Sequence, residues 1–293
     1  MIPSIDADLV ARLVANQFPQ WAQLPVVPVS PQGWDNRTFR VGSELSARLP
    51  SAEGYALQVV KEQRWLPHLA AHLALPIPEP VALGLPALGY PFAWSVSRWL
   101  DGVVLSRAHG INQAQLAEEL AAFLVALRQV PAADGPPAGP VTAYRGTPLT
   151  HYADEALSAF RSLDPVTAAL AEEVFHAAVT TRWEREPVWF HGDFAADNVL
   201  IRHGRLHAVL DFGCAGVGDP ACDLVIAFTW LDHAGRHVFR RAVGLDDETW
   251  LRGRGWALWK AAITLLDSAA PRLRKQEQRR ALTAVLDDFA TKC

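Results

Sequence analysis

The sequence is short of cysteine and methionine, and neither sign of charge prevails in it. Its 293 residues include one methionine and three cysteines, with no C-x-x-C pair and no Cys/His cluster at zinc spacing. We therefore expect neither a disulfide framework nor a structural zinc site. Asp and Glu outnumber Lys and Arg by 31 to 27, for a formal net charge of −4. This balance argues against a basic nucleic-acid binder.

Long apolar runs are also missing. The nearly uncharged stretch 76–97 is broken by proline and glycine and contains Glu79, so we expect no membrane span. The first residues lack the basic region and apolar run of a signal peptide. Half of the residues are hydrophobic, which is too many for a disordered chain. We expect a folded, monomeric protein of the cytoplasm, with neither nucleic acid nor membrane as partner.

Motifs of three common enzyme classes are absent or incomplete. No G-x-S-x-G occurs, which argues against a nucleophilic hydrolase, and no Gly-Lys-Ser/Thr occurs, which excludes a P-loop. Residues 216–221 fit the dinucleotide-binding pattern G-x-G-x-x-A. Pro220 at its fifth position and the lack of a second βαβ unit argue against that interpretation.

Strand-like runs occupy much of the first hundred residues, and helical patterns dominate after Gly102. The strand-like runs of the first part are 26–29, 38–41, 45–49 and 92–100. We expect an opening helix capped by Ser4 and a second helix over 56–73, which Pro67 kinks or interrupts. Three further strand-like runs lie at 188–190, 199–201 and 206–212. The order predicts an α+β protein.

Segment 189–223 carries the residues with the clearest chemistry. Asp193, Asn198 and Asp211 each stand at or just beyond the end of an apolar run, where a rigid scaffold presents reactive groups. Carboxylate and amide oxygens suit Mg²⁺, and a carboxylate free of metal can orient and deprotonate an attacking hydroxyl. His-Gly-Asp, four residues, then Asn, with Asp-Phe-Gly following, has the spacing of a phosphoryl-transfer site. Surface turn carboxylates, the alternative, would not explain this spacing.

These motifs resemble those of the aminoglycoside phosphotransferase family of kinase-like enzymes. The family signature joins H-G-D and an N-V-L strand to D-F-G and a G-D-P-x-x-D-L run, present here as residues 218–224. The resemblance spans about residues 30–265. It implies a bilobal protein-kinase-like fold, with a strand-rich N-lobe over 1–99 and a mainly helical C-lobe over 100–293. It also implies Mg²⁺-dependent transfer of the γ-phosphate of ATP or GTP to a small-molecule hydroxyl.

The resemblance assigns the central roles residue by residue. Asp193 is the expected catalytic base, and Asn198 and Asp211 are the expected Mg²⁺ ligands. Arg48 stands where most kinases place the lysine that contacts the α- and β-phosphates, with Glu62 as its helix partner. A guanidinium can grip phosphate with two parallel hydrogen bonds. The alternative for Arg48 is a solvated residue at a strand edge.

Further residues are expected to bind nucleotide or to support the catalytic loop. The loop 33–38, which contains Trp34, is expected to cover phosphate through backbone N–H groups and the side chain of Asn36 or Thr38. Arg98, Trp99 and Leu100 should form the hinge whose backbone reads the adenine edge. The expected supporting residues are His191, which anchors the loop, Asp219, which starts a helix at Pro220, and Asp223, which bonds back to the catalytic loop.

The family resemblance implies an aminoglycoside-type antibiotic as the acceptor, and the residues themselves leave others open. Four acidic residues either attract a polycation or form a solvated or capping run: Asp232, Asp246, Asp247 and Glu248. Trp230, Trp256 and Trp259 form either an apolar acceptor wall, which would suit a macrolide, or part of the core. Choline, homoserine, sugars and a catalytically inactive nucleotide-binding protein remain alternatives. The hydroxyl phosphorylated, a role in antibiotic resistance and the choice of ATP or GTP also stay open.

Overall fold

The computed structural model describes residues 4–30, 32–33 and 35–291. The chain forms two compact units. Unit 1 comprises residues 1–102 and 208–213, and unit 2 comprises 103–207 and 214–293. The short segment 208–213 therefore belongs with the first unit, although it follows the catalytic-loop motif in the sequence. None of the described helices is long and apolar enough to cross a membrane.

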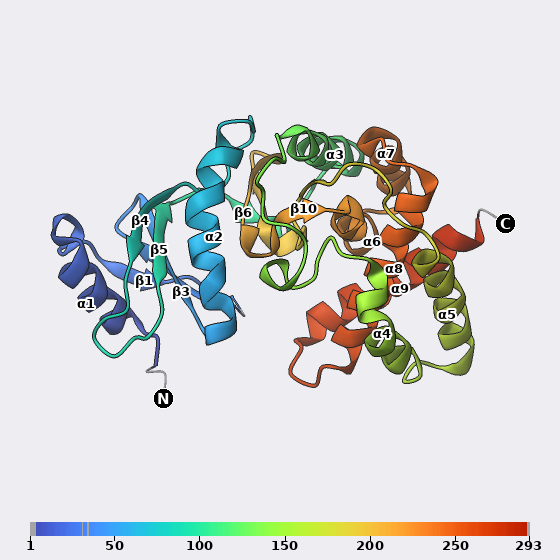
Figure 1. Ribbon diagram of the computed structural model, residues 1–293, viewed down its shortest axis with the longest axis horizontal. Helices are drawn as coiled ribbons and strands as arrows, with labels where there is room; N and C mark the ends of the chain where they lie inside the picture. The colour runs from blue at the N-terminus through green and yellow to red at the C-terminus, as the bar shows by residue number, and fades with distance from the viewer. Residues whose placement is uncertain (1–3, 31, 34, 292–293) are drawn as a thin grey trace. The chain divides into compact units, whose positions relative to one another are not determined.

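Unit 1 is built on a five-stranded antiparallel sheet (Figure 1). The strand order is β1-β2-β3-β5-β4. The strands are β1 Val26–Pro28, β2 Asn36–Val41, β3 Leu45–Pro50, β4 Pro80–Gly84 and β5 Trp94–Arg98. The helices of this unit are α1 Ala7–Gln17 and α2 Glu53–Ala70.

The two helices of unit 1 lie on opposite faces of its sheet. Alternate residues of β3, including Ala47 and Leu49, are buried with the apolar face of α1 in one cluster. The residue between them, Arg48, points to the other face, where it meets Glu62 of α2. The period-two alternation of β3 thus separates an apolar core from a polar face that holds Arg48.

Two details of unit 1 differ from the sequence-based expectation. Asp6, not Ser4, caps α1, because its carboxylate accepts a hydrogen bond from the N–H of Leu9 at 2.9 Å. Pro67 lies inside α2 and does not interrupt it. The ring removes one backbone hydrogen bond in the last turn, while Leu66 and Leu69 on either side of it are buried. Tertiary burial therefore outweighs the local cost of proline.

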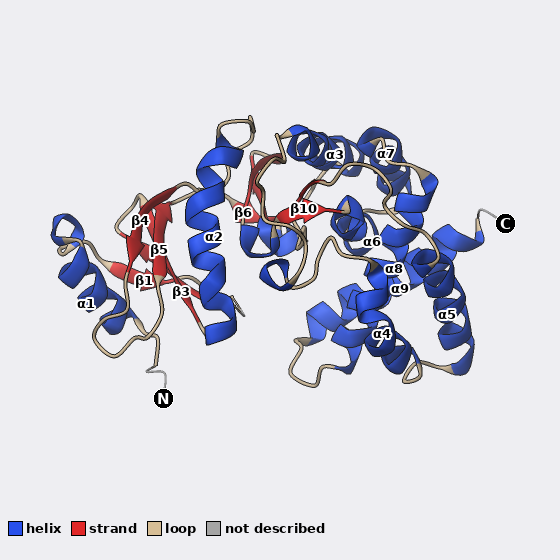
Figure 2. Ribbon diagram, viewed as in Figure 1, coloured by secondary structure: helices blue, strands red, loops and turns tan. Residues whose placement is uncertain are grey.

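Unit 2 is mainly helical, as the blue ribbons of Figure 2 show. Its helices are α3 Gln113–Gln129, α4 Ala153–Phe160, α5 Pro165–Val179, α6 Val225–Thr229, α7 His233–Val243, α8 Asp247–Leu266 and α9 Arg272–Ala290. Its strands are β6 Val103–Val104, β7 Val188–Phe190, β8 Val199–Arg202 and β10 Gly216–Gly218, and β9 Arg205–Val209 runs on into the segment that belongs to unit 1. The expected α+β class, strand-rich first and helical later, is confirmed.

Helix α8 is the central helix of unit 2, with α4, α5, α6 and α9 packed against it. The buried guanidinium of Arg254 on α8 pairs with Asp288 of α9 at 2.6 Å, and the indole N–H of Trp250 donates to the same carboxylate at 2.9 Å. These bonds tie the N-terminal half of α8 to α9. Further along α8, the indole N–H of Trp259 donates to Glu155 at 2.6 Å.

Candidate active site

The His-Gly-Asp motif follows strand β7 and is held by one buried carboxylate. Asp223 is 2% exposed and accepts hydrogen bonds from the backbone N–H groups of His191 at 2.8 Å and Gly192 at 2.7 Å. This is the bond back to the catalytic loop that the sequence analysis expects. Gly192 has a φ of +84°, and a Cβ there would lie 2.5 Å from the carbonyl oxygen of Cys214. Only glycine fits this turn.

Two neighbours of the motif brace it further. His191 is fully buried, and its Nδ1 accepts the backbone N–H of Asp193 at 3.3 Å. Asp219 accepts the N–H of Ala221 at the start of the turn Pro220–Leu224 and pairs with the buried Arg252 at 2.7 Å. His191 thus contacts the loop itself, whereas Asp219 contacts the turn that carries Asp223.

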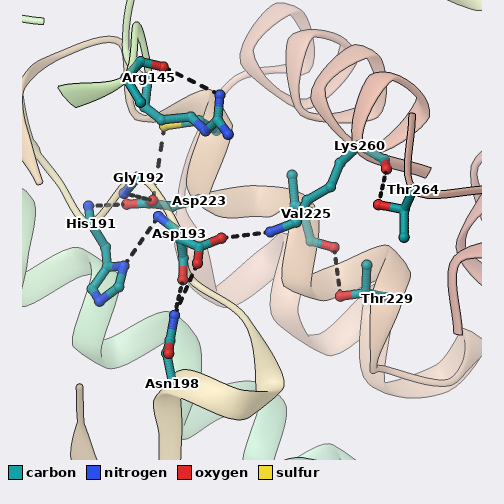
Figure 3. Close-up of polar contacts among 12 residues, drawn as sticks. Arg145, His191, Gly192, Asp193, Asn198, Asp223, Val225, Thr229, Lys260 and Thr264 are labelled. Atoms are coloured by element: carbon teal, nitrogen blue, oxygen red, sulfur yellow. Dashed lines mark hydrogen bonds and ion pairs between the residues drawn. The ribbon is translucent and has the colours of Figure 1, made fainter. Parts of the chain in front are cut away.

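Asp193 is the centre of a small polar cluster in unit 2. Its Oδ1 lies 2.6 Å from Nζ of Lys260, and its Oδ2 accepts from Nδ2 of Asn198 at 3.1 Å (Figure 3). Asn198 also donates to the backbone oxygen of Asp193 at 2.9 Å. Burial alone would raise the pKa of Asp193, but the Lys260 ammonium holds that pKa well below its usual range. The carboxylate is therefore ionised at neutral pH.

Arg48 joins the two other expected site carboxylates in unit 1. Its guanidinium lies 3.4 Å from Oε1 of Glu62 and 2.9 Å from Oδ1 of Asp211. Arg48 is 16% exposed on a strand with neighbours on both sides, so the alternative of a solvated edge residue is wrong. Burial alone would lower its pKa, but Asp211 and Glu62 raise it above the ordinary value. Burial raises the pKa of Glu62, and Arg48 opposes that shift.

The Asp-Phe-Gly segment is tied to α2 as well as to Arg48. Nζ of Lys61 donates to the carbonyl oxygen of Gly213 at 2.6 Å, and Asp211 itself has a φ of +63°. The strand β9 ends at Val209, two residues before Asp211, so the expected strand 206–212 is too long. The unusual backbone of Asp211 turns its carboxylate out of the strand and toward Arg48.

The two expected magnesium ligands each keep an oxygen for a metal. Asn198 uses its amide nitrogen to bond Asp193, which leaves its carbonyl oxygen. Both Arg48 and the N–H of Gly213 bond Oδ1 of Asp211, which leaves Oδ2. These are the hard oxygen donors that Mg²⁺ takes. Within the described ranges no group of three or more His, Cys, Asp or Glu side chains forms a metal site of protein ligands alone.

Strand β2 carries the two polar residues expected to cap phosphate. Asn36 is buried, and Thr38 lies opposite Arg48 in the register of β2 and β3. Gln32 braces the approach to this strand, since it accepts from the N–H of Thr38 at 2.8 Å and donates to its carbonyl at 3.0 Å. Trp34, in the same loop, lies outside the described residues.

The expected hinge uses much of its backbone within the protein. The backbone N–H of Arg98 donates to the backbone carbonyl oxygen of Glu79 at 2.9 Å. The backbone N–H of Trp99 donates to the carbonyl oxygen of Glu44 at 2.8 Å. The indole of Trp99 donates to Asp101, and the Arg40 guanidinium lies 4.7 Å from its ring centre. Of the three expected hinge residues, Leu100 is therefore the one whose backbone N–H remains to donate a hydrogen bond to a nucleotide base.

A pocket in unit 2 contains two cations that the sequence analysis does not single out. Asp193, Lys260 and Arg145 line it together with Trp256 and Trp259. Lys260 carries a recognisable signal, because lysine is rare in this chain and this one interrupts an apolar, tryptophan-rich helix. Arg145 carries none, since it lies in a loop far from every motif. Trp256 and Trp259 do line the pocket, while Trp256 is also almost wholly buried.

The strand-rich unit with its Arg-Glu pair and the helical unit with its His-Gly-Asp loop define a kinase-like phosphotransferase. Residues 26–284 match the profile of the Phosphotransferase enzyme family. The chain belongs to this family, and the family resemblance seen in the sequence is confirmed. It is therefore a phosphotransferase that acts on hydroxyl groups. A search of curated proteins found no match.

Solved structures show the same fold at low sequence identity. The GDP and kanamycin complex of APH(2")-IIIa is 21% identical, with a TM-score of 0.74 over 97% of this chain and 99% of that one. A ternary complex of APH(4)-Ia with AMP-PNP and hygromycin B is 20% identical, with a TM-score of 0.64 over 96% and 99%. Macrolide 2'-phosphotransferase MphH from Brachybacterium faecium is 20% identical, with a TM-score of 0.60 over 94% and 97%. The expected kinase-like fold is confirmed.

Proposed function

We propose that the protein transfers the γ-phosphate of a nucleoside triphosphate, with Mg²⁺, to a hydroxyl of a small molecule bound in the pocket of unit 2. The observation that carries this proposal is the carboxylate of Asp193, which lines the pocket while Lys260 and Asn198 hold both of its oxygens. A carboxylate fixed in this way can receive the hydrogen bond of an acceptor hydroxyl.

The contacts of Asp193 with Lys260 and Asn198 bear on how this residue acts. The Lys260 ammonium lowers the pKa of the carboxylate, which makes it a weaker base. Phosphoryl transfer passes through a loose transition state in which the hydroxyl keeps its proton until late. Asp193 therefore acts chiefly by orienting the hydroxyl, and it accepts the proton as the new bond to phosphorus forms.

Unit 1 supplies the expected nucleotide ligands. Arg48, kept charged by Glu62 and Asp211, would contact the α- and β-phosphates, and Asn36 or Thr38 would cap phosphate. Asp211 and Asn198 would ligate Mg²⁺, which neutralises charge on the phosphates. The backbone N–H of Leu100 would donate a hydrogen bond to the base of the nucleotide. Relatives of similar fold bind GDP, ADP and AMP-PNP, which supports nucleotide use without choosing between ATP and GTP.

The acceptor is supported less specifically. Relatives bind kanamycin and hygromycin B or are named for macrolides, which makes these antibiotics the first compounds to test. Acidic residues proposed to attract a polycation have other uses here. Asp232 caps α7, Asp246 caps α8 and pairs with Arg185, and Asp247 pairs with Arg240. They give no local support for a polycationic acceptor.

The test is a transfer assay joined to a binding assay. Calorimetry should detect binding of Mg-ATP or Mg-GTP, and a screen over aminoglycosides, macrolides, choline and sugars should reveal phosphorylation of at least one alcohol. Absence of nucleotide binding to the folded wild-type chain would refute the proposal. An inactive kinase-like protein would instead bind nucleotide and phosphorylate no acceptor. Increased resistance of a susceptible bacterium that expresses the chain would separate an antibiotic kinase from a metabolic one.

A further inference from the structure

The guanidinium of Arg145 lines the pocket of unit 2, where its charge acts on Asp193 without forming an ion pair with it. It stacks on the ring of Trp259 at 4.4 Å, and its Nη1 donates to the hydroxyl of Tyr152 at 3.1 Å and to the carbonyl oxygen of Ala143 at 3.4 Å. These contacts fix its position through neutral groups. Throughout the described part of the chain, no ion pair includes Arg145.

The other polar groups of the pocket are mostly hydrogen-bond donors too. Lys260 contributes an ammonium, and the indole Nε1 of Trp256 is buried without a hydrogen-bond partner among the described residues. A buried donor that stays unpaired costs free energy, so it favours a ligand that offers an acceptor atom. The pocket has one carboxylate, Asp193, which Lys260 and Asn198 already engage (Figure 3).

The acidic side chains described near the pocket form no ion pair with the Arg145 guanidinium. Glu155 accepts the indole N–H of Trp259 at 2.6 Å, and Asp197 accepts from the hydroxyl of Ser106. Burial raises the pKa of Glu277, and the charges of Arg274 and Lys260 oppose that shift; Glu277 does not line the pocket. The charged side chains that line the pocket are therefore two cations and one anion, for a formal charge of +1.

We propose that the acceptor alcohol carries an anionic group, a carboxylate or a phosphate, and that Arg145 binds it while the acceptor hydroxyl faces Asp193. This inference rests on the proposed phosphotransferase function. A guanidinium presents parallel N–H donors that match the geometry of such an anion. The rings of Trp256 and Trp259 supply an apolar wall for the body of the acceptor. An aminoglycoside would place ammonium groups beside the cations Arg145 and Lys260.

Matched probes test the charge of the acceptor. One series is glucuronate, glucose and glucosamine, another is lactate, lactamide and isopropanolamine, and glycerol phosphate set against glycerol separates phosphate from carboxylate. Saturation-transfer NMR measures the affinity of each probe for the full chain with Mg-AMP-PNP bound. The anionic member of at least one series should bind about tenfold to a hundredfold more tightly than its neutral and ammonium partners, as expected for a hydrogen bond between charged groups. Kanamycin serves as the polycation.

Variants assign the preference to Arg145. Arg145→Gln should abolish the preference for the anion, Arg145→Lys should keep part of it, and Arg161→Gln, at an exposed arginine of the same unit, should keep all of it. Thermal melting of each variant shows that it is folded. Equal binding within every series, tighter binding of the ammonium members or of kanamycin, or a preference that survives Arg145→Gln would overturn the proposal.

Two further outcomes separate this inference from the function on which it rests. If Arg145→Gln weakens Mg-AMP-PNP binding and leaves probe binding unchanged, Arg145 serves the nucleotide phosphates and the acceptor proposal is wrong. If the wild-type chain does not bind Mg-AMP-PNP, the proposed function fails. The same probes, titrated without nucleotide, then still report whether Arg145 binds anions.

Discussion

The two units each hold a site carboxylate against a cation, but they do so in different ways. In unit 1, Asp211 meets Arg48, whose guanidinium is also bonded to Glu62 and whose strand has neighbours on both sides. In unit 2, Asp193 meets Lys260, a single ammonium on a flexible stem. An arginine fork between two carboxylates is rigid, whereas a lysine can move away from its partner. Arg48 is therefore held between two carboxylates, whereas Lys260 is paired with one.

Exposure separates the Arg48–Glu62 pair from both site carboxylates. Arg48 and Glu62 are 16% and 8% exposed, whereas Asp211 is 36% and Asp193 is 38% exposed. Removing one partner of a buried pair leaves an uncompensated charge, which is costly. Water screens a pair as open as Lys260 and Asp193, so its contribution to stability is small, about 1 kcal/mol or less. The Arg48–Glu62 pair should therefore matter for the stability of the fold. The Lys260–Asp193 pair should matter for the reactivity of the Asp193 carboxylate.

The largest expected effect is on catalysis in unit 2. Asp193→Ala should lower kcat about a hundredfold to ten-thousandfold, the usual range for a lost acid-base group. Nucleotide affinity should change less than kcat, because the bond from Asn198 to the backbone oxygen of residue 193 does not need the carboxylate. Steady-state kinetics with the best acceptor and calorimetry with Mg-ATP check the two parts. Asp154→Asn, at an exposed residue of α4, is the matched control, and equal rates in both variants would remove Asp193 from the mechanism.

The next effect is on the stability of unit 1. Arg48→Met leaves Glu62 buried beside Asp211 with no guanidinium, so the free energy of unfolding should fall by about 3–5 kcal/mol. Arg48→Met combined with Glu62→Leu should recover most of this loss, because no unpaired charge then remains buried. Urea titration followed by circular dichroism measures both variants. A single variant as stable as the wild type would show that the fork in unit 1 is not a structural element.

Sequence reasoning finds the parts of the site that local spacing specifies. Asp193, Asn198 and Asp211 lie in one short segment whose strands and turns follow directly from its pattern. Lys260 is 67 residues from Asp193 and reaches it only because α8 packs against several other helices. The unpaired guanidinium of Arg145 is likewise a property of tertiary packing. No spacing rule predicts such contacts, since they depend on how whole helices dock.

The fold follows a similar division. Hydrophobic alternation predicts β2 and β3, and with them the side of the sheet on which Arg48 lies. The same approach misplaces the cap of α1 and overestimates the effect of Pro67, because both depend on which atoms the folded chain brings together. The hinge offers a further example. The sequence predicts its position, and only the structure shows that the backbone N–H groups of Arg98 and Trp99 already donate to the carbonyl oxygens of Glu79 and Glu44.

A smaller effect concerns the pH dependence of unit 2. Lys260 lowers the pKa of Asp193, so Lys260→Met should raise that pKa toward its ordinary value. Activity that needs the ionised carboxylate would then be lost at a higher pH as the solution is acidified. The stability that the pair contributes is present above the ordinary pKa of an aspartate and is lost as pH falls through the lowered one. The acid limb of kcat/KM against pH reports the shift.

A matched lysine makes that experiment specific. Lys275→Met removes a lysine of α9 that does not line the pocket, and its acid limb should coincide with that of the wild type. If the limbs of Lys260→Met and the wild type also coincide, the ammonium does not tune Asp193. Arg48 would then still be expected to stabilise unit 1, but Lys260 would not be a residue that sets the pKa of Asp193.

The smallest effect concerns Asp246, a carboxylate outside the pocket that Asp193 lines. Asp246 accepts from the N–H of Thr249 at 2.8 Å and from its hydroxyl at 2.6 Å at the start of α8. Asp246→Ala should cost about 1 kcal/mol of stability, the usual cost of a lost helix cap, and Asp246→Asn should cost less. Urea titration measures this cost. The KM for kanamycin, or for the best acceptor found, should not change.

The opposite outcome would be a raised KM for a polycation in Asp246→Ala. If Asp246→Asn, which can keep the cap, raises that KM equally, the charge of Asp246 attracts substrate. Asp246 would then belong with the carboxylates that bind substrate, and not only with those that cap helices.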